Sequence, residues 1–188
     1  MSDIPNVLVR EINKHDVELL ADYWFKSDFE HLNRMGADKE KLPPRTRMIE
    51  MLFEQIYLPL KDKTSYALIW ELDGKQIGHS NVNNIIYGVE ATMHLHLWKS
   101  DNRKRGLGSA LVKKSLHYYF NNLKLSKIIC EPYALNQAPN KTLQKLGFDF
   151  IKRYLTIPGS INFEQQVNRW ELTKDKYEEI THYNKTYK

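Results

Sequence analysis

The sequence has a single cysteine, Cys130, among its 188 residues, and no uninterrupted apolar run approaches the ~18 residues that cross a membrane. One cysteine forms neither an intramolecular disulfide nor a cysteine-based metal site, which favours a reducing compartment. No charged-then-apolar leader precedes Asp3. We therefore expect a cytoplasmic protein with no membrane partner.

The chain also has little excess of charge of one sign. Lys and Arg number 28 against 23 Asp and Glu, which gives a formal net charge of +5. The basic residues are dispersed except at 103–105, so the sequence lacks the extended basic patch that binds nucleic acid. A short anionic ligand is the better inference, and a small RNA-binding protein is the weaker alternative.

The composition is that of an ordinary globular protein, with 41% hydrophobic and 12% aromatic residues. A length of 188 residues fits one domain. We find no internal repeat, low-complexity tract or linker. The sequence therefore predicts one domain over residues 1–188, which ends in a polar tail at 173–188.

Two hydrophobic periodicities alternate along the chain and predict a mixed α/β (α+β) fold with about seven strands and about four helices. The expected helices span His15–Phe25, Thr46–Leu60, Gly106–Asn122 and Asn136–Leu146. The expected strands span Asn6–Ile12, Tyr66–Leu72, Gln76–Ile86, Glu90–Trp98, Lys127–Pro132, Asp149–Ile157 and Glu164–Leu172. Asp73-Gly74 is a tight-turn signal, so the second to fourth strands should form an antiparallel meander. Residues 29–35 and the start of the tail are left open as short helical pieces.

A basic loop with two glycines, Arg103-Lys104-Arg105-Gly106-Leu107-Gly108-Ser109, joins a predicted strand to a predicted helix. The free N–H groups and the positive end of the helix dipole meet at such a turn, which suits an anion such as phosphate. The loop is neither G-x-x-x-x-G-K-[ST] nor a Rossmann G-x-G-x-x-G, which would need glycine in place of Leu111. A solvated charged turn is the alternative.

Two motifs together resemble the GNAT superfamily of acetyl-coenzyme A-dependent N-acetyltransferases, and in particular its RimJ/RimL-like branch. The first is Arg103-x-x-Gly106-x-Gly108, of the form [QR]-x-x-G-x-[GA], and the second is Asn136-x-x-Pro139 followed by Leu146-Gly147-Phe148. The resemblance covers essentially Thr64 to Leu172. It implies a GNAT-like sheet whose fourth and fifth strands splay apart. It also implies transfer of an acetyl group from acetyl-CoA to a primary amine by direct attack in a ternary complex.

The same resemblance implies where coenzyme A binds. Arg105 to Ser109 would hold the pyrophosphate, with Arg103 bracing the turn, and the backbone near Leu97 and Trp98 would be free to pair with the pantetheine arm, which Asn136 would also contact. The implied cofactor-binding residues are Leu97, Trp98, Arg103, Lys104, Arg105, Gly106, Leu107, Gly108, Ser109, Asn136 and Asn140. No metal is expected.

Three residues are candidates for the catalytic groups. By the resemblance Glu131, five residues before Asn136, occupies the position of a general base, and desolvation at the end of an apolar strand would raise its pKa. An ordinary ion pair with Lys or Arg is the alternative. His94 and His96 share one side of a strand and have near-neutral reference pKa values, so either could accept a proton. The alternative is a hydrogen-bonded pocket wall, and a metal pair is disfavoured.

The main departure from the family pattern is Leu143, where many GNAT enzymes have a tyrosine that protonates the leaving thiolate. RimJ/RimL-like branches often share this lack, and Tyr133 is a possible substitute. A non-catalytic CoA-binding sensor or interaction module is therefore the alternative function. The acceptor, a small molecule or a protein N-terminus, is not specified by any motif, and both a monomer and a homodimer remain open.

Overall fold

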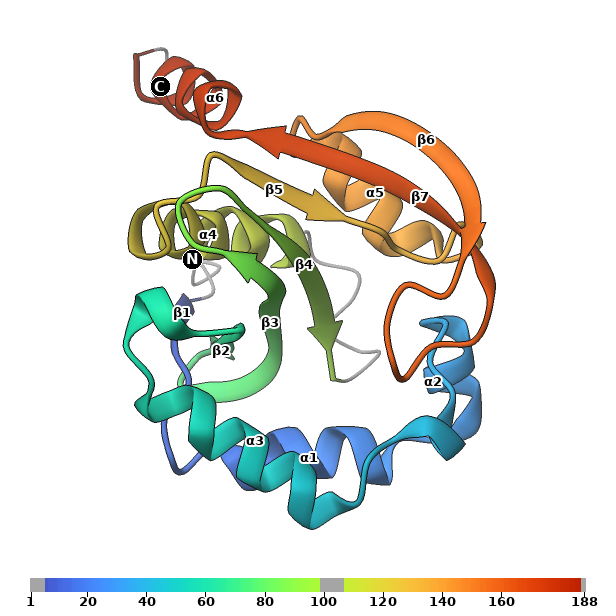
Figure 1. The fold of residues 1–188 in the computed structure, drawn as a ribbon. Helices are drawn as coiled ribbons and strands as arrows, with labels where there is room; N and C mark the ends of the chain where they lie inside the picture. Colours follow the sequence, from blue (N-terminus) through green and yellow to red (C-terminus); the bar gives the residue numbers. More distant parts are fainter. Residues whose placement is uncertain (1–5, 99–106, 187–188) are drawn as a thin grey trace, which may run out of the picture.

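The computed structural model describes residues 6–98 and 107–186 and contains a seven-stranded mixed sheet (Figure 1). The strands are β1 (Val7–Glu11), β2 (Ser65–Leu72), β3 (Lys75–Ile86), β4 (Glu90–Leu97), β5 (Lys127–Cys130), β6 (Asp149–Thr156) and β7 (Gln165–Thr173). Their order is β1-β2-β3-β4-β5-β7-β6, and every neighbouring pair is antiparallel except β4 and β5. The predicted mixed α/β (α+β) fold with an antiparallel meander is confirmed.

Six α-helices occur in the described part of the chain, where the sequence predicted about four. They are α1 (Val17–Lys26), α2 (Phe29–Arg34), α3 (Arg45–Tyr57), α4 (Leu107–Asn122), α5 (Gln137–Lys145) and α6 (Lys174–Thr186). The additions are α2, which is too short to show a helical period, and α6, which continues directly from β7. None of these helices combines the length and the apolar composition needed to cross a membrane.

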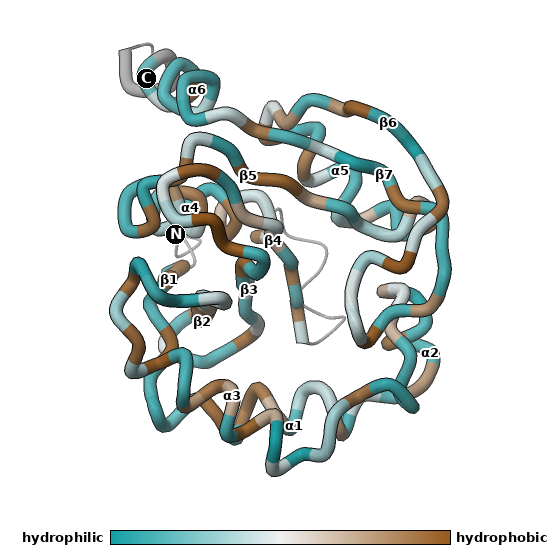
Figure 2. Tube along the Cα trace, in the orientation of Figure 1, coloured by the Kyte–Doolittle hydropathy of each residue, from teal (hydrophilic) through white to brown (hydrophobic). Residues whose placement is uncertain are grey.

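The helices cover the two faces of the sheet (Figure 1). α1 and α3 pack together over β2, whereas α4 packs across β1 and β3 and contacts α5. The main hydrophobic core lies under α4 and includes Trp70, Leu111 and Phe120. Figure 2 shows β5 as a hydrophobic stretch, and its Ile128 and Ile129 are buried. This confirms the prediction that β5 is a central strand covered on both faces.

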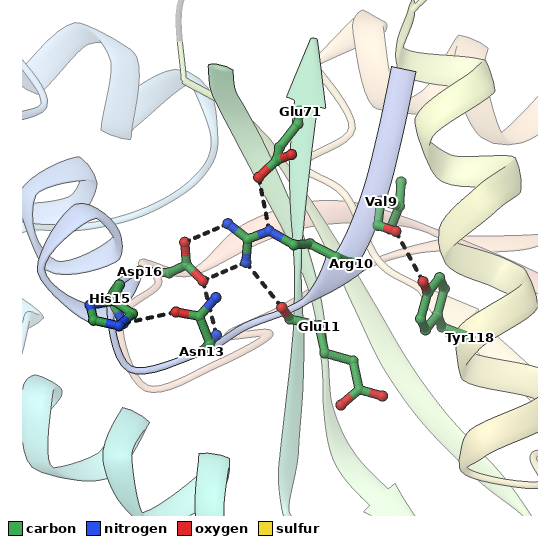
Figure 3. A network of polar contacts seen from close by, with 8 residues as sticks. All are labelled: Val9, Arg10, Glu11, Asn13, His15, Asp16, Glu71 and Tyr118. Atoms are coloured by element: carbon green, nitrogen blue, oxygen red, sulfur yellow. Dashed lines mark hydrogen bonds and ion pairs between the residues drawn. The ribbon is translucent and has the colours of Figure 1, made fainter. Parts of the chain in front are cut away.

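A buried ion pair fixes the start of α1 on the sheet (Figure 3). Both carboxylate oxygens of Asp16, which caps α1, accept hydrogen bonds from the Arg10 guanidinium at 2.6 and 2.8 Å. The Arg10 Nε also donates to Glu71 of β2 at 2.8 Å. Asp16 is only 2% exposed, so its charge depends on Arg10 for compensation. The network sets the direction of α1 and hence the position of Tyr23 near its end.

β4 and β5 pair over a short length and then separate. Their parallel ladder joins Glu90–Thr92 to Lys127–Ile129, and no later residue of β4 has a partner on β5. β5 ends at Cys130, two residues before Pro132, which has no N–H to continue a ladder. The splayed fourth and fifth strands predicted from the sequence are therefore present. The candidate catalytic side chains His94, His96 and Glu131 line a pocket at the gap between them.

Candidate functional site

Two pockets open into the gap between β4 and β5. We call them the histidine pocket, which contains His94, His96 and Glu131, and the glycine pocket, which contains Gly108 at the start of α4. Four residues line both, so the pockets meet: Met35, Leu95, Asn136 and Pro139. Their empty volumes, with open solvent included, are about 610 and 750 Å³.

The glycine pocket joins an apolar wall to a helix N-terminus. Trp70, Leu97 and Val112 line it, and the first N–H groups of α4 have no partner within the helix. A Cβ built on Gly108 would meet no protein atom within 4 Å, so it would occupy pocket space. This glycine is therefore not required by protein packing, and its absent side chain leaves room for a ligand to approach the helix end.

The basic part of the loop, Arg103, Lys104, Arg105 and Gly106, lies outside the described residues. Among the other residues expected to bind the cofactor there, Leu107 is 4% exposed and its side chain belongs to the core, so only its backbone is available for binding. Ser109 is half-buried on the same turn and lines neither of these pockets.

The backbone of β4 faces the gap at different residues from those expected. The Trp98 N–H donates to the carbonyl of Ile77 on β3 at 2.9 Å, so it is not free. Because the residues of an antiparallel pair alternate in direction, Leu95 and Leu97 turn their N–H and C=O groups away from β3, into the gap. The expectation is therefore corrected at Trp98, whose N–H is used by the sheet, and Leu95 joins Leu97 as the available backbone.

The two asparagines of α5 have different surroundings. Asn136 caps the helix without a side-chain hydrogen bond to it and lines both pockets at their junction. The Asn140 amide, in contrast, donates to the carbonyls of Tyr133 and Asn136, and its oxygen accepts from Asn168 and Trp170. Because both donors and the acceptor are used within the protein, the proposed cofactor role of Asn140 is corrected to a structural one.

His94 and His96 lie on the same side of β4, as the strand period predicted, and both line the histidine pocket. Nε2 of His94 is 3.0 Å from Oδ1 of Asn83, and Nδ1 of His96 is 3.3 Å from the hydroxyl of Tyr23. Burial lowers the pKa of His94 to about 4 and holds that of His96 well below 6.5. The near-neutral pKa values expected from the sequence are therefore wrong, and both imidazoles are neutral at pH 7.

Sequence reasoning missed two members of this cluster, His79 and Tyr23. His79 lies opposite His96 on β3 and stacks on it with ring centroids 4.4 Å apart. It accepts a hydrogen bond from the Trp98 indole at 2.8 Å, and burial lowers its pKa to about 3. Strand register could have indicated His79, whereas no sequence signal brings Tyr23 of α1 to β4.

Glu131 lies at the end of β5 in an ion pair. Its Oε1 accepts hydrogen bonds from Arg169 at 2.9 Å and from the Tyr154 hydroxyl at 2.5 Å. An ion pair with Lys or Arg was the alternative that the sequence analysis left open for Glu131. The carboxylate therefore lies among polar partners and not in the apolar surroundings expected of a general base. Glu131 still lines the histidine pocket, and its charge acts on His94.

The two remaining candidates, Leu143 and Tyr133, line the histidine pocket but not the glycine pocket. Leu143 is fully buried and lines the histidine pocket. The position at which many GNAT enzymes have a tyrosine therefore holds a side chain that cannot donate a proton. Tyr133 lines the same pocket and packs edge-on against Phe163. Within the described chain no group of three His, Cys, Asp or Glu side chains is placed to hold a metal ion.

The fold is similar to those of solved acetyltransferases. A spermidine N-acetyltransferase from Vibrio cholerae, solved in complex with CoA and spermine, superposes with a TM-score of 0.73 at 17% identity, over 91% of this chain and 97% of that one. The aminoglycoside acetyltransferase AAC(6')-Ib, solved in complex with coenzyme A, gives a TM-score of 0.69 at 19% identity, over 94% and 99%. At these identities the likeness establishes the fold. No curated protein sequence matches the chain.

A sequence model of a known family gives the assignment. The model of the acetyltransferase (GNAT) domain matches residues 6–149, which span β1 to the start of β6 and include every strand and helix around the gap except β7. The chain therefore belongs to the GNAT acetyltransferase domain family.

Proposed function

We propose that the chain is an N-acetyltransferase that transfers the acetyl group of acetyl-CoA to a primary amine by direct attack in a ternary complex. The observation that carries the proposal is the junction of the two pockets at Leu95 and Asn136, inside the gap between β4 and β5.

 

Leu95 contributes free backbone at this junction and Asn136 contributes a side-chain amide, so a ligand in either pocket reaches both. A donor in the glycine pocket and an acceptor in the histidine pocket would meet there, which is the proximity that a bimolecular transfer requires.

The glycine pocket fits coenzyme A. Its phosphates would lie at the N–H groups that begin α4, in the space left by Gly108, and its arm would pair with the backbone of Leu95 and Leu97. When bound, acetyl-CoA supplies an activated acetyl thioester. Cys130, which lines the histidine pocket, is a poor covalent carrier for that acetyl group, because burial raises the pKa of its thiol and keeps it protonated. Direct attack by the amine is therefore favoured.

The histidine pocket favours a small amine with a single positive charge over a polyamine. Of the described residues that line it, Glu131 is the one acidic side chain, and Arg169 already pairs with it. The other polar side chains are neutral imidazoles, amides such as Asn162 and Gln165, and a tyrosine hydroxyl. Such a lining can hydrogen-bond an amine but cannot balance several cationic charges.

Two measurements test the proposal. Acetyl-CoA at millimolar concentration should raise the melting temperature, because it binds the native state, and an unchanged melting temperature would contradict a CoA site. Release of the CoA thiol, followed with a panel of monoamines and polyamines, should then be faster with a monoamine. Faster release with spermidine would contradict the proposed acceptor class.

A variant sharpens the test of the acceptor. Arg169→Gln leaves Glu131 without its cation, so it should shift kcat/KM toward the polyamine relative to the monoamine. Lys176→Gln is the matched control, because it removes an equal charge from an ion pair with Asp149 outside the pocket. The proposed acceptor class would be refuted if both variants changed the preference equally.

A second function, non-catalytic binding of CoA by a sensor, is supported by Leu143, which has no proton to give a leaving thiolate. It predicts a rise in melting temperature with acetyl-CoA and no thiol release with any amine. The RimJ/RimL-like branch, in which this lack is common, stays a prediction, and so do the monomeric or dimeric state and the cytoplasmic location.

A further inference from the structure

His94 and His96 each use one ring nitrogen within the protein and leave the other open. His94 uses Nε2 toward Asn83, and His96 uses Nδ1 toward Tyr23. Among the described residues every fully buried side-chain nitrogen or oxygen has a hydrogen-bond partner. The second nitrogen of each ring has none, so it is accessible, and the histidine pocket is the surface that both rings line.

The protonation of His96 follows from a chain of hydrogen bonds that starts at Arg34. The Arg34 guanidinium can only donate, so the Nδ1 of His31, 3.1 Å away, is an acceptor and neutral His31 carries its proton on Nε2. That proton points to the Tyr23 hydroxyl oxygen at 3.0 Å.

Within the described part of the chain, two other atoms can accept the Tyr23 hydroxyl proton. These are Nδ1 of His96 at 3.3 Å and the sulfur of Met35 at 3.0 Å. An imidazole nitrogen is a stronger acceptor than a thioether sulfur. Nδ1 of His96 therefore accepts, and the proton of this neutral ring lies on Nε2, the nitrogen that is open to the pocket.

His94 has the same tautomer as His96, but it uses the other ring nitrogen, Nε2, toward its partner. The amide oxygen of Asn83 can only accept, so Nε2 of His94 carries the proton and donates it to Asn83. The open nitrogen of His94 is then Nδ1, which carries a lone pair. Glu131 lies close enough for its charge to favour the protonated form of this ring.

We propose that Tyr23 and Asn83 are positioning residues that make the two histidines complementary, so that His96 presents an N–H donor and His94 presents a lone pair to the histidine pocket. This inference rests on the proposed acetyl transfer for its chemical consequence. The amine nitrogen forms a bond to the acetyl carbon as the carbon–sulfur bond breaks. The attacking amine is the neutral form, so a cationic amine first releases one proton to solvent. On attack a second proton moves from the nitrogen to Nδ1 of His94 and is returned to the sulfur, while the Nε2–H of His96 stabilises the carbonyl oxygen.

The test is a long-range 1H–15N correlation spectrum of protein labelled with 15N-histidine, which reports the tautomer of each ring. Both His94 and His96 should show the Nε2–H form. Tyr23→Phe keeps the aromatic ring but removes the hydroxyl, so it should change the signals of His96 and of His31, whose Nε2–H also bonds to that hydroxyl, and leave those of His94 unchanged. Asn83→Ala should change the His94 signals alone.

Controls and kinetics separate positioning from folding. Tyr118→Phe removes a hydroxyl that bonds to Val9 outside both pockets, and it should leave every pocket histidine unchanged. Tyr23→Phe should lower kcat by roughly 2- to 13-fold, the worth of one hydrogen bond, with little change in the KM for acetyl-CoA. An Nδ1–H tautomer at either ring, or His96 signals that do not respond to Tyr23→Phe, would overturn the proposal. Because the spectrum needs no turnover, absence of acetyl transfer would count against the proposed function alone.

Discussion

Replacement of Gly108 by alanine should strengthen the fold and weaken the binding of acetyl-CoA. Gly108 is the second residue of α4, and a Cβ there meets no protein atom within 4 Å. Alanine is favoured over glycine in a helix by roughly 0.5–1 kcal/mol. For a chain of this size 1 kcal/mol corresponds to about 2–4 °C, so the melting temperature without ligand should rise by up to about that amount.

The same Cβ would enter the space in the glycine pocket that we assign to the phosphates of acetyl-CoA. Forcing an extra methyl group into a close-packed contact costs about 1–3 kcal/mol, which corresponds to roughly 5- to 150-fold in the dissociation constant. Calorimetric titration with acetyl-CoA measures this loss. A Gly108→Ala protein that binds acetyl-CoA as tightly as the wild type would refute the placement of the ligand at α4.

Gly88→Ala is the matched control for an added methyl group. A Cβ on Gly88 also meets no atom within 4 Å, but its φ of +78° lies in the left-handed region that an alanine side chain disfavours. The variant should therefore lose about 1–2 kcal/mol of stability and bind acetyl-CoA normally. The two glycines thus give changes of opposite sign in stability, and only one of them changes binding.

Two further predictions concern stability. The pKa values of His94 and His79, about 4 and about 3 in the folded protein, lie below the value of about 6.5 in the unfolded chain. The unfolded chain therefore binds more protons than the folded protein between these pH values. Urea titrations should show the free energy of unfolding falling as the pH drops from about 6.5 toward 4, by up to about 1.4 kcal/mol per pH unit for each histidine. A free energy of unfolding that rises over this range would contradict the buried neutral rings. Asn140→Ala should lower the free energy of unfolding by about 1–3 kcal/mol, because it leaves buried partners such as the Trp170 indole without a hydrogen bond. Unchanged stability with weaker binding of acetyl-CoA would instead restore the cofactor role of Asn140.

The elements of the fold could be predicted from the sequence because their signals are local. Asp73-Gly74 marked the β2–β3 turn, and both residues have positive φ as a tight turn requires. The apolar run of β5 indicated a strand covered on both faces. The insertion of β7 between β5 and β6 carries no such signal, because it depends on pairing between segments far apart in the chain.

The site was less predictable for the same reason. The motifs and their spacing predicted that Gly108, Asn136 and the two histidines of β4 lie at one gap in the sheet. They could not predict which side chains hydrogen-bond to these residues. Tyr23 and His96 are 73 residues apart and meet through the tertiary packing of α1, whose start is held on the sheet by the Arg10–Asp16 ion pair. Their contact helps to bury the His96 ring, and this burial lowers its pKa well below the reference value.

The central claim, transfer of an acetyl group from acetyl-CoA to an amine, is tested most directly with acetyl-CoA that carries 13C in the acetyl carbonyl. In the presence of the protein and a monoamine, the 13C signal of the thioester should be lost and replaced one-for-one by the signal of an amide. Conversion to acetate alone, or a thioester signal that persists with every amine although acetyl-CoA is bound, would contradict the account.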